Sequence, residues 1–413
     1  MKSPPGTRAP PYDAQSINDT IERALASAGI DTSTGPMREV TETIRRALDP
    51  DGAASAATAS PQQEGVIDVE ATVIDLAEDA EQDGVESPVE APARPAGKAP
   101  AKDATQAPGT FLKHEFRNRA GARPYKLYRP ARAAHGPALL VMLHGCTQSA
   151  DDFAVGTRMN QLAEEHGFLV VYPEQLAKAN TSKCWNWFKP EDQARGTGEP
   201  ALIAGIVQEV AQQHGVAPRR IFVAGLSAGA AMAVVMGETY PELFAGVGVH
   251  SGLAFGSAKD VASAMARMKG GRSGMPGLKG MPVDLAGSGA RATRAVPTIV
   301  FHGDRDHTVQ QSNAGEVVKQ ARDAHETGAG GVGLTERTQA GEARGGRRYT
   351  RTVHANASGH VIIESWVLHG AGHAWSGGDA RGSYTDAVGP DASAEMVRFF
   401  LALPVTGYTD HGL

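Results

Sequence analysis

The 413-residue sequence predicts an α/β fold with one mostly parallel sheet and helices on both of its faces. Short, almost continuously apolar segments recur between residues 125 and 370, and helical stretches such as residues 201–215 and 312–325 separate several of them. Continuous apolar strands are typical of parallel sheets, which helices bury on both faces. The segments expected to be strands are residues 125–130, 138–145, 168–174, 220–225, 244–252, 297–303 and 361–370.

The composition argues against several classes of function. The formal net charge of −6 gives no general electrostatic reason to bind nucleic acid or an anionic membrane. No segment approaches the roughly 18 consecutive apolar residues of a membrane-spanning helix, and the start, MKSPPGTRAPPYDAQ, lacks the apolar stretch of a secretory signal. We therefore expect no nucleic-acid partner, no membrane span and, by sequence, a cytoplasmic location.

The chain before residue 111 differs in character from the rest. Residues 1–50 contain two short helical patterns, TIERAL and TIRRAL, and are expected to form a short helical segment that docks on the main domain, frays, or binds a partner as a hairpin. Residues 51–110 are rich in Ala, Pro and acidic residues, and we expect a disordered linker because such a composition cannot bury a core. Residues 111–413 then form the α/β domain, in which the glycine-rich residues 328–346 are expected to be a surface loop.

A serine between two glycines follows one of the predicted strands. The segment Gly225-Leu226-Ser227-Ala228-Gly229 fits the pattern G-x-S-x-G, in which a strand turns sharply into a helix and presents the serine hydroxyl clear of the backbone. Glycines flank the serine because that turn leaves no room for side chains. In a chain with 49 glycines the pattern alone is weak evidence, so the rest of the sequence must decide whether Ser227 is a nucleophile.

An acid and a histidine follow two later strands, in the order expected of α/β-hydrolases. One strand leads into GDRDHTV, which contains Asp304 and Asp306, and another leads into AGHAWSGG, which contains His373. A serine hydroxyl needs an imidazole to take its proton, and the imidazole needs a carboxylate to fix its tautomer. We prefer Asp306 to Asp304 because it lies deeper in its loop, which leaves Asp304 to cap or turn the chain. The predicted catalytic residues are Ser227, Asp306 and His373, and the predicted fold is an α/β-hydrolase fold.

A serine hydrolase also needs N–H donors for the oxyanion that develops during attack. One donor is usually the residue after the nucleophile, and the other lies in the loop after an early strand. Ala228 directly follows Ser227, and Cys146 follows a predicted strand in the turn His144-Gly145-Cys146. We expect the oxyanion hole at the backbone N–H groups of Cys146 and Ala228.

Three tryptophans lie near these motifs in the sequence. Trp185 and Trp187 follow the predicted sheet edge, and Trp375 lies two residues after His373. They are predicted to line an ester-binding cleft, with packing in the core as the alternative. No cofactor and no metal site are expected, since the two cysteines lack the spacing of zinc ligands.

Seven motifs together resemble the poly(3-hydroxybutyrate) depolymerase family of esterases. The resemblance spans roughly residues 111–403, and several long motifs in the right order make it much more specific than G-x-S-x-G alone. It implies an α/β-hydrolase that cleaves ester bonds in polyesters or oligoesters of short-side-chain 3-hydroxyalkanoates, with Ser227, Asp306 and His373 as its triad. The motifs are HGCTQSADDF, VVYPEQ, CWNWF, GTGEPALIAGIV, GLSAGAAMA, FHGDRDHTV and GAGHAWSGG.

The resemblance also implies a disulfide between Cys146 and Cys184, because family members often pair the cysteines of the HGC and CWNWF motifs. Such a bond needs an oxidising compartment. The family is often extracellular, whereas the start of this chain shows no export signal. The sequence leaves the redox state of the two cysteines open.

Two alternatives to a polyester esterase remain at this point. Feruloyl and acetylxylan esterases are similar to the same family, so a carbohydrate ester is the closest rival substrate. The other alternative is a non-catalytic protein that binds polyester granules or a partner through its N-terminal helices, since folds are reused without their chemistry.

Overall fold

The computed structural model describes residues 109–271, 295–327 and 333–404. The predicted helical segment, residues 1–50, and all but the end of the predicted linker, residues 51–110, lie outside the described residues, so both stay predictions. None of the helices in the described ranges combines the length and the hydropathy that a bilayer span requires.

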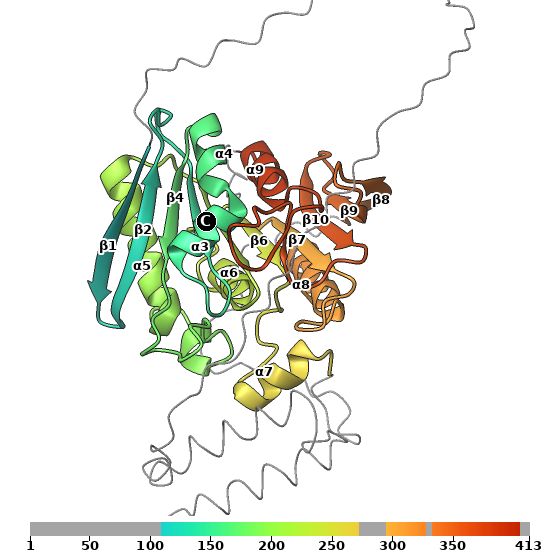
Figure 1. Ribbon diagram of the computed structural model, residues 1–413, viewed down its shortest axis with the longest axis horizontal. Coiled ribbons are helices and arrows are strands. Elements are labelled where there is room, and N and C mark those ends of the chain that lie inside the picture. Colours follow the sequence, from blue (N-terminus) through green and yellow to red (C-terminus); the bar gives the residue numbers. More distant parts are fainter. Residues whose placement is uncertain (1–108, 272–294, 328–332, 405–413) are drawn as a thin grey trace, which may run out of the picture. The chain divides into compact units, whose positions relative to one another are not determined.

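The described residues contain one large twisted sheet of ten strands (Figure 1). Its spatial order is β1-β2-β4-β3-β5-β6-β7-β10-β9-β8. The six strands from β4 to β10 in this order are parallel, and antiparallel strands flank them at both ends. In chain order the strands are β1 (Thr110–Asn118), β2 (Gly121–Arg129), β3 (Leu139–Leu143), β4 (Leu169–Pro173), β5 (Ile221–Leu226), β6 (Gly246–His250), β7 (Thr298–Gly303), β8 (Thr335–Glu342), β9 (Arg348–Ala355) and β10 (Val361–Leu368).

All seven predicted strands are present, whereas β1, β8 and β9 were not predicted. The expectation of a surface loop over residues 328–346 is wrong for β8. Its sequence, TERTQAGE, is polar and almost fully exposed, so it lacks the apolar run that marks a buried strand. It pairs with β9 as an antiparallel hairpin at the sheet edge, where polar strands are tolerated.

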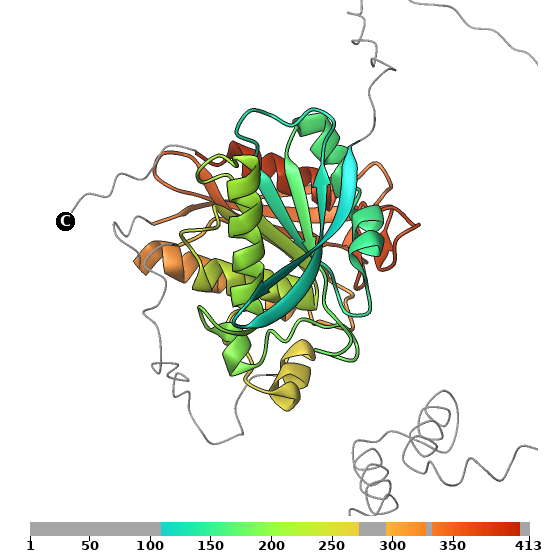
Figure 2. The same cartoon turned by 90° about the vertical axis from the view of Figure 1, so that its left-hand side faces the viewer.

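Helices cover both faces of the sheet. One core cluster contains side chains of α5 (Gly198–His214), α6 (Ala228–Thr239) and α8 (Ser312–Thr327), and a second contains side chains of α3 (Ala150–Thr157), α4 (Met159–His166) and α9 (Ala392–Ala402). Successive residues of β3 alternate between the two clusters, as buried parallel strands do. Figure 2 shows α5, in yellow-green, beside the first strands of the sheet. The described fold also contains a 3-10 helix, η2 (Pro190–Gln193), a short helix, α7 (Val261–Met268), and a pair of two-residue strands, β11 (Trp375–Ser376) and β12 (Thr385–Asp386).

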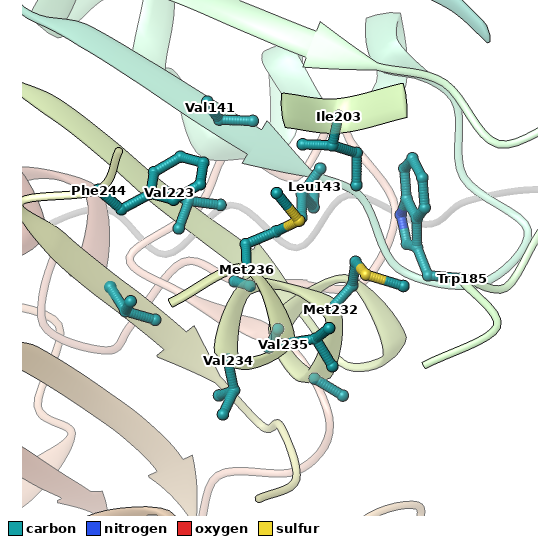
Figure 3. Packing of buried hydrophobic residues seen from close by; sticks show 14 of the residues in the cluster. Val141, Leu143, Trp185, Ile203, Val223, Met232, Val234, Val235, Met236 and Phe244 are labelled. Atoms are coloured by element: carbon teal, nitrogen blue, oxygen red, sulfur yellow. The ribbon is translucent and has the colours of Figure 1, made fainter. Parts of the chain in front are cut away.

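The helix α6 is apolar along almost its whole length. Figure 3 shows Met232 and Met236 on the side of α6 that faces β3 and Trp185. Both methionines are fully buried, and Val235 beside them is 1% exposed. Because neighbouring side chains surround α6 so completely, its first turn, which begins directly after Ser227, is fixed against the sheet.

One buried carboxylate stabilises the second half of the sheet. Glu364 of β10 is fully buried and accepts hydrogen bonds from the Arg351 guanidinium through both of its oxygens, each at 2.9 Å. Arg398 of α9 and the indole N–H of Trp366 also donate to it. Burial disfavours the charged carboxylate, but the hydrogen bonds from the two arginines outweigh burial and lower the pKa of Glu364.

Replacing Glu364 by Gln should lower the free energy of unfolding by about 2–3 kcal/mol at pH 7, because two arginines would lose their buried partner while remaining partly hydrated. The folded carboxyl has a lowered pKa, so its contribution is complete above the unfolded pKa, about 4.3, and is lost as the pH falls further. The difference between wild type and Glu364→Gln should therefore shrink from pH 4 downward. Urea unfolding at several pH values measures this difference in the free energy of unfolding. Glu316→Gln, at an exposed carboxyl of α8, serves as the control.

Candidate active site

The candidate nucleophile lies at the sharp turn between β5 and α6. Ser227 has φ 57° and ψ −120°, a conformation that non-glycine residues rarely adopt. Its N–H donates to the carbonyl of His250 at 2.9 Å, and its side chain is 8% exposed. A Cβ added to Gly229 would lie 2.0 Å from the Leu143 carbonyl oxygen, and one added to Gly225 would lie 2.4 Å from the Gly229 carbonyl carbon. The two flanking glycines are therefore required by the close approach of α6 to β3.

Asp306 and His373 are in direct contact. His373 Nδ1 lies 2.7 Å from Asp306 Oδ2, and Asp306 is 2% exposed. The two loops that carry them are also joined through their backbones, since the Asp304 N–H donates to Leu368 at 3.1 Å and the Arg305 N–H donates to Ala371 at 3.0 Å. The loop after β7 and the loop after β10 therefore hold the carboxylate and the imidazole as one unit.

The other aspartate of the loop has a different partner. Asp304 Oδ2 lies 2.9 Å from His369 Nδ1, and its Oδ1 accepts the Gly370 N–H at 2.7 Å. Asp304 therefore supports the loop that leads to His373 without contacting that histidine. This arrangement agrees with the preference for Asp306 that the sequence suggested.

The environment of Asp306 keeps its carboxyl ionised. Burial disfavours the charged form, but hydrogen bonds from His302 and His373 outweigh burial and hold the pKa of Asp306 well below its usual range. The other oxygen, Oδ1, accepts the N–H groups of Thr308 at 2.9 Å and Val309 at 2.8 Å. Because a carboxylate faces Nδ1 of His373, that nitrogen carries the proton and Nε2 is left to accept one.

Another buried histidine connects the ends of the strands. The carbonyl of His250, at the end of β6, accepts the Ser227 N–H, and its ring Nε2 accepts the Ser376 N–H at 3.0 Å. The ring stacks on Trp375 with centroids 5.2 Å apart. Burial lowers the pKa of His250 to about 3, so the ring stays neutral and acts as a fixed support.

The two predicted oxyanion donors lie at one place in the fold. Ala228 is the first residue of α6, so its N–H has no acceptor within the helix. The added Cβ at Gly229 would also lie 2.5 Å from the His144 carbonyl oxygen, which places the first turn of α6 directly against the turn that carries Cys146. The N-terminal end of a helix favours negative charge, so this corner suits an oxyanion.

A disulfide joins Cys146 to Cys184, with an S–S distance of 2.06 Å. The next residue, Thr147, donates its N–H to the Ser182 carbonyl at 2.7 Å. The segment around Cys184 is itself anchored, because the buried carboxylate of Glu199 accepts both the backbone and the side-chain N–H of Asn186 at 2.8 Å. The turn that carries Cys146 is thus tied to a rigid neighbour.

A hydrogen-bond network that the sequence analysis missed holds the same turn from the other side. The Gly145 N–H donates to Gln148 Oε1 at 2.9 Å, and Gln148 Nε2 donates to Asp152 Oδ2 at 2.8 Å. Ser383 donates to Asp152 through both its N–H, at 2.9 Å, and its hydroxyl, at 2.5 Å. The spacing of Gln148 and Asp152 in HGCTQSADDF was the available signal, but nothing in the sequence connected them with Ser383.

The prediction that tryptophans line the cleft is wrong for two of the three. Trp185 is fully buried and donates from Nε1 to the His144 carbonyl at 3.2 Å, while Trp375 is 1% exposed and donates to the Ser393 hydroxyl at 3.0 Å. Because almost none of either residue is exposed, neither indole has a free face for a ligand. Trp187 is 5% exposed, and its place in a cleft stays a prediction.

The family model described as "Esterase PHB depolymerase" matches residues 123–346, which is more than half of the chain. The chain belongs to this family of esterases. Both the resemblance read from the motifs and the predicted α/β-hydrolase fold are thereby confirmed.

The similar proteins include a polyester depolymerase and carbohydrate esterases. Poly(3-hydroxyalkanoate) depolymerase C of Paucimonas lemoignei is 35% identical over 237 residues, covering 57% of this chain and 54% of that protein. Acetylxylan esterase A of Talaromyces purpureogenus is 33% identical over 212 residues, covering 49% of this chain and 53% of that protein. The chain thus spans about half the length of these curated relatives.

A solved structure supports the fold independently. The acetyl xylan esterase from Aspergillus awamori superposes with a TM-score of 0.51 at 22% identity, covering 68% of this chain and 94% of that one. At this identity the likeness shows a shared fold.

Asp306→Asn should lower kcat for p-nitrophenyl acetate by about 10³–10⁴-fold, because an amide neither fixes the His373 tautomer nor stabilises the imidazolium. Asp304→Asn is the matched control on the same loop, and we expect it to lower kcat less than tenfold. Thermal unfolding of both variants verifies their folding. Equal losses in the two variants would contradict the assignment of Asp306.

Reducing the disulfide should loosen the turn that carries Cys146. Its two cysteines are 38 residues apart in sequence, and a loop of that length corresponds to about 3–4 kcal/mol of stability. We expect dithiothreitol to lower both the melting temperature and kcat/KM of the wild type. The Cys146→Ala, Cys184→Ala double variant should start from the lower values and show no response to dithiothreitol; a response in that variant would mean that the reductant acts elsewhere.

Proposed function

We propose that this chain is a serine esterase that cleaves ester bonds of short-side-chain 3-hydroxyalkanoate polyesters or oligoesters through an acyl-enzyme on Ser227. The observation that carries the proposal is the 2.7 Å contact between His373 and a buried, ionised Asp306, at the same sheet edge as the strained turn that presents Ser227. Membership of the PHB depolymerase family supports the same chemistry.

The first half of the reaction forms the acyl-enzyme. His373 Nε2 takes the Ser227 proton as Oγ attacks the ester carbonyl, and the resulting imidazolium is stabilised by Asp306. The N–H groups of Cys146 and Ala228 receive the oxyanion. The tetrahedral intermediate then collapses, the ester C–O bond breaks, and the imidazolium gives its proton to the leaving alcohol.

The second half regenerates the enzyme. Water gives a proton to His373 Nε2 and attacks the acyl carbonyl, and a second oxyanion forms at the same two N–H groups. Its collapse releases the hydroxy acid and returns the proton to Ser227. The ionised Asp306 serves both halves, because each passes through an imidazolium.

The choice of a polyester substrate rests on the family description and on the depolymerase of Paucimonas lemoignei. The acetylxylan esterase of Talaromyces purpureogenus favours a second candidate, a carbohydrate ester, for the same triad. Association with polyester granules, a task for the chain before residue 111, is part of the proposal. In the non-catalytic alternative, this association would be the whole function.

Ser227→Ala should lower turnover of a p-nitrophenyl ester by about a thousandfold or more while the unfolding transition stays near that of the wild type. Unchanged turnover would refute the assignment of Ser227, and a wild type that a serine-directed phosphonate fails to label would favour the non-catalytic alternative.

A substrate panel decides the natural ester. It should include amorphous polyhydroxybutyrate, hydroxybutyrate oligomers, and acetyl and feruloyl sugar esters, with Ser227→Ala as the blank. We expect the highest kcat/KM on the hydroxybutyrate oligomers; a preference for the sugar esters would select the second candidate.

A further inference from the structure

Tyr384 combines an exposed position with a strained backbone. Tyr384 is 47% exposed, among the most exposed large hydrophobic residues in the described part of the chain. Its backbone has φ 52°, in the left-handed region that favours glycine. Strained backbone conformations of this kind are found more often at functional sites, where the surrounding structure holds the residue in place.

The surrounding structure does hold Tyr384 on both sides. The preceding residue, Ser383, donates its N–H to Asp152 at 2.9 Å. The Tyr384 carbonyl accepts the Trp375 N–H at 2.7 Å, and the following residue, Thr385, pairs with Trp375 in the short β11–β12 sheet. The conformation of Tyr384 is therefore imposed by its neighbours.

Tyr384 contacts residues next to both parts of the candidate active site, the turn that carries Cys146 and the loop that carries His373. Its hydroxyl lies 3.3 Å from the hydroxyl of Thr147, which directly follows the proposed oxyanion donor Cys146. Its carbonyl is bound by Trp375, two residues after His373. In Figure 1 the loop after β10, in red, runs beside α3, the helix that follows the Cys146 turn. In the proposed reaction, the ester carbonyl lies between the Cys146 N–H and His373. Tyr384 is therefore expected to lie beside the bound ester.

We propose that Tyr384 is a substrate-binding residue, whose exposed ring packs against the hydrocarbon face of the 3-hydroxyacyl unit next to the scissile ester. The proposal rests on the proposed function above. A 3-hydroxybutyrate unit presents methyl and methylene groups between its ester groups, and aromatic faces bind such surfaces well. The hydrogen bond to Thr147 orients the ring and leaves its faces for the substrate.

Val388 provides a matched control. It lies on the same loop and is 43% exposed, close to the value for Tyr384. However, its backbone lies against Gly345, in the turn between β8 and β9, away from the contact with Thr147. If exposed apolar surface on this loop mattered in general, Val388→Ala would have the same effect as a change at Tyr384.

The test compares hydrolysis of a 3-hydroxybutyrate trimer with hydrolysis of ethyl acetate, both followed by pH-stat. We expect Tyr384→Ala to raise KM for the trimer about five- to tenfold with kcat within about twofold, and to raise KM for ethyl acetate much less. Tyr384→Phe keeps the ring and should stay within about twofold on the trimer, and Val388→Ala should match the wild type on both esters. Tyr384→Asn should reproduce the effect of Tyr384→Ala without backbone strain, because Asn tolerates positive φ, so this variant answers the question if the alanine variant folds poorly.

Three outcomes would overturn the proposal, and they are distinguishable. A wild type that does not cleave the trimer would defeat the proposed function and this inference with it. An active wild type with unchanged trimer KM in Tyr384→Ala and Tyr384→Asn would defeat this inference alone. A loss of kcat on both esters with unchanged KM would show that Tyr384 acts only by positioning the Cys146 turn.

Discussion

The contact between the first turn of α6 and the end of β3 is the constraint on which the rest of the site depends. At Gly229 the backbones approach so closely that a single added carbon would lie 2.0 Å from the Leu143 carbonyl oxygen. This contact sets the conformation of Ser227 at the start of α6 and brings the N–H of Ala228 next to the Cys146 turn. The buried, apolar α6 holds the contact together, because it cannot shift without opening the core around Met232 and Met236.

The charge of the site depends on one buried carboxylate, that of Asp306. A carboxylate as buried as Asp306 would be unstable alone, yet four N–H groups converge on it: two backbone amides, the His302 ring and the His373 ring. These donors stabilise the ionised carboxylate of Asp306. Its negative charge in turn fixes which nitrogen of His373 is protonated. By contrast, burial is the largest influence on the pKa of the fully buried His250 and lowers it, so this ring remains neutral. The sheet edge therefore holds the charged carboxylate of Asp306 in direct contact with the proposed base, His373.

The sequence predicted those parts of the molecule that local patterns determine. The buried strands were found because each is a continuous apolar run, and the same runs explain why the predicted residues Ser227, Asp306 and His373 lie just after strand ends. The exposed strand β8 was missed because its pairing, and not its composition, makes it a strand. The burial of Trp185 and Trp375 was missed because it depends on partners, the His144 carbonyl and the Ser393 hydroxyl, that only the tertiary structure brings close.

The chemistry of the site and its selectivity differ in the same way: local sequence patterns indicate the first, and tertiary contacts determine the second. The proposed triad residues follow the ends of parallel strands, where this kind of sheet commonly carries its functional groups, and the connecting loops are free to differ between proteins. The walls of the site come from longer loops such as the one that carries Tyr384, whose position depends on Asp152 and on the β11–β12 pairing. Under the proposed function, the substrate preference of this chain is therefore expected to be set by loop residues that carry no catalytic motif.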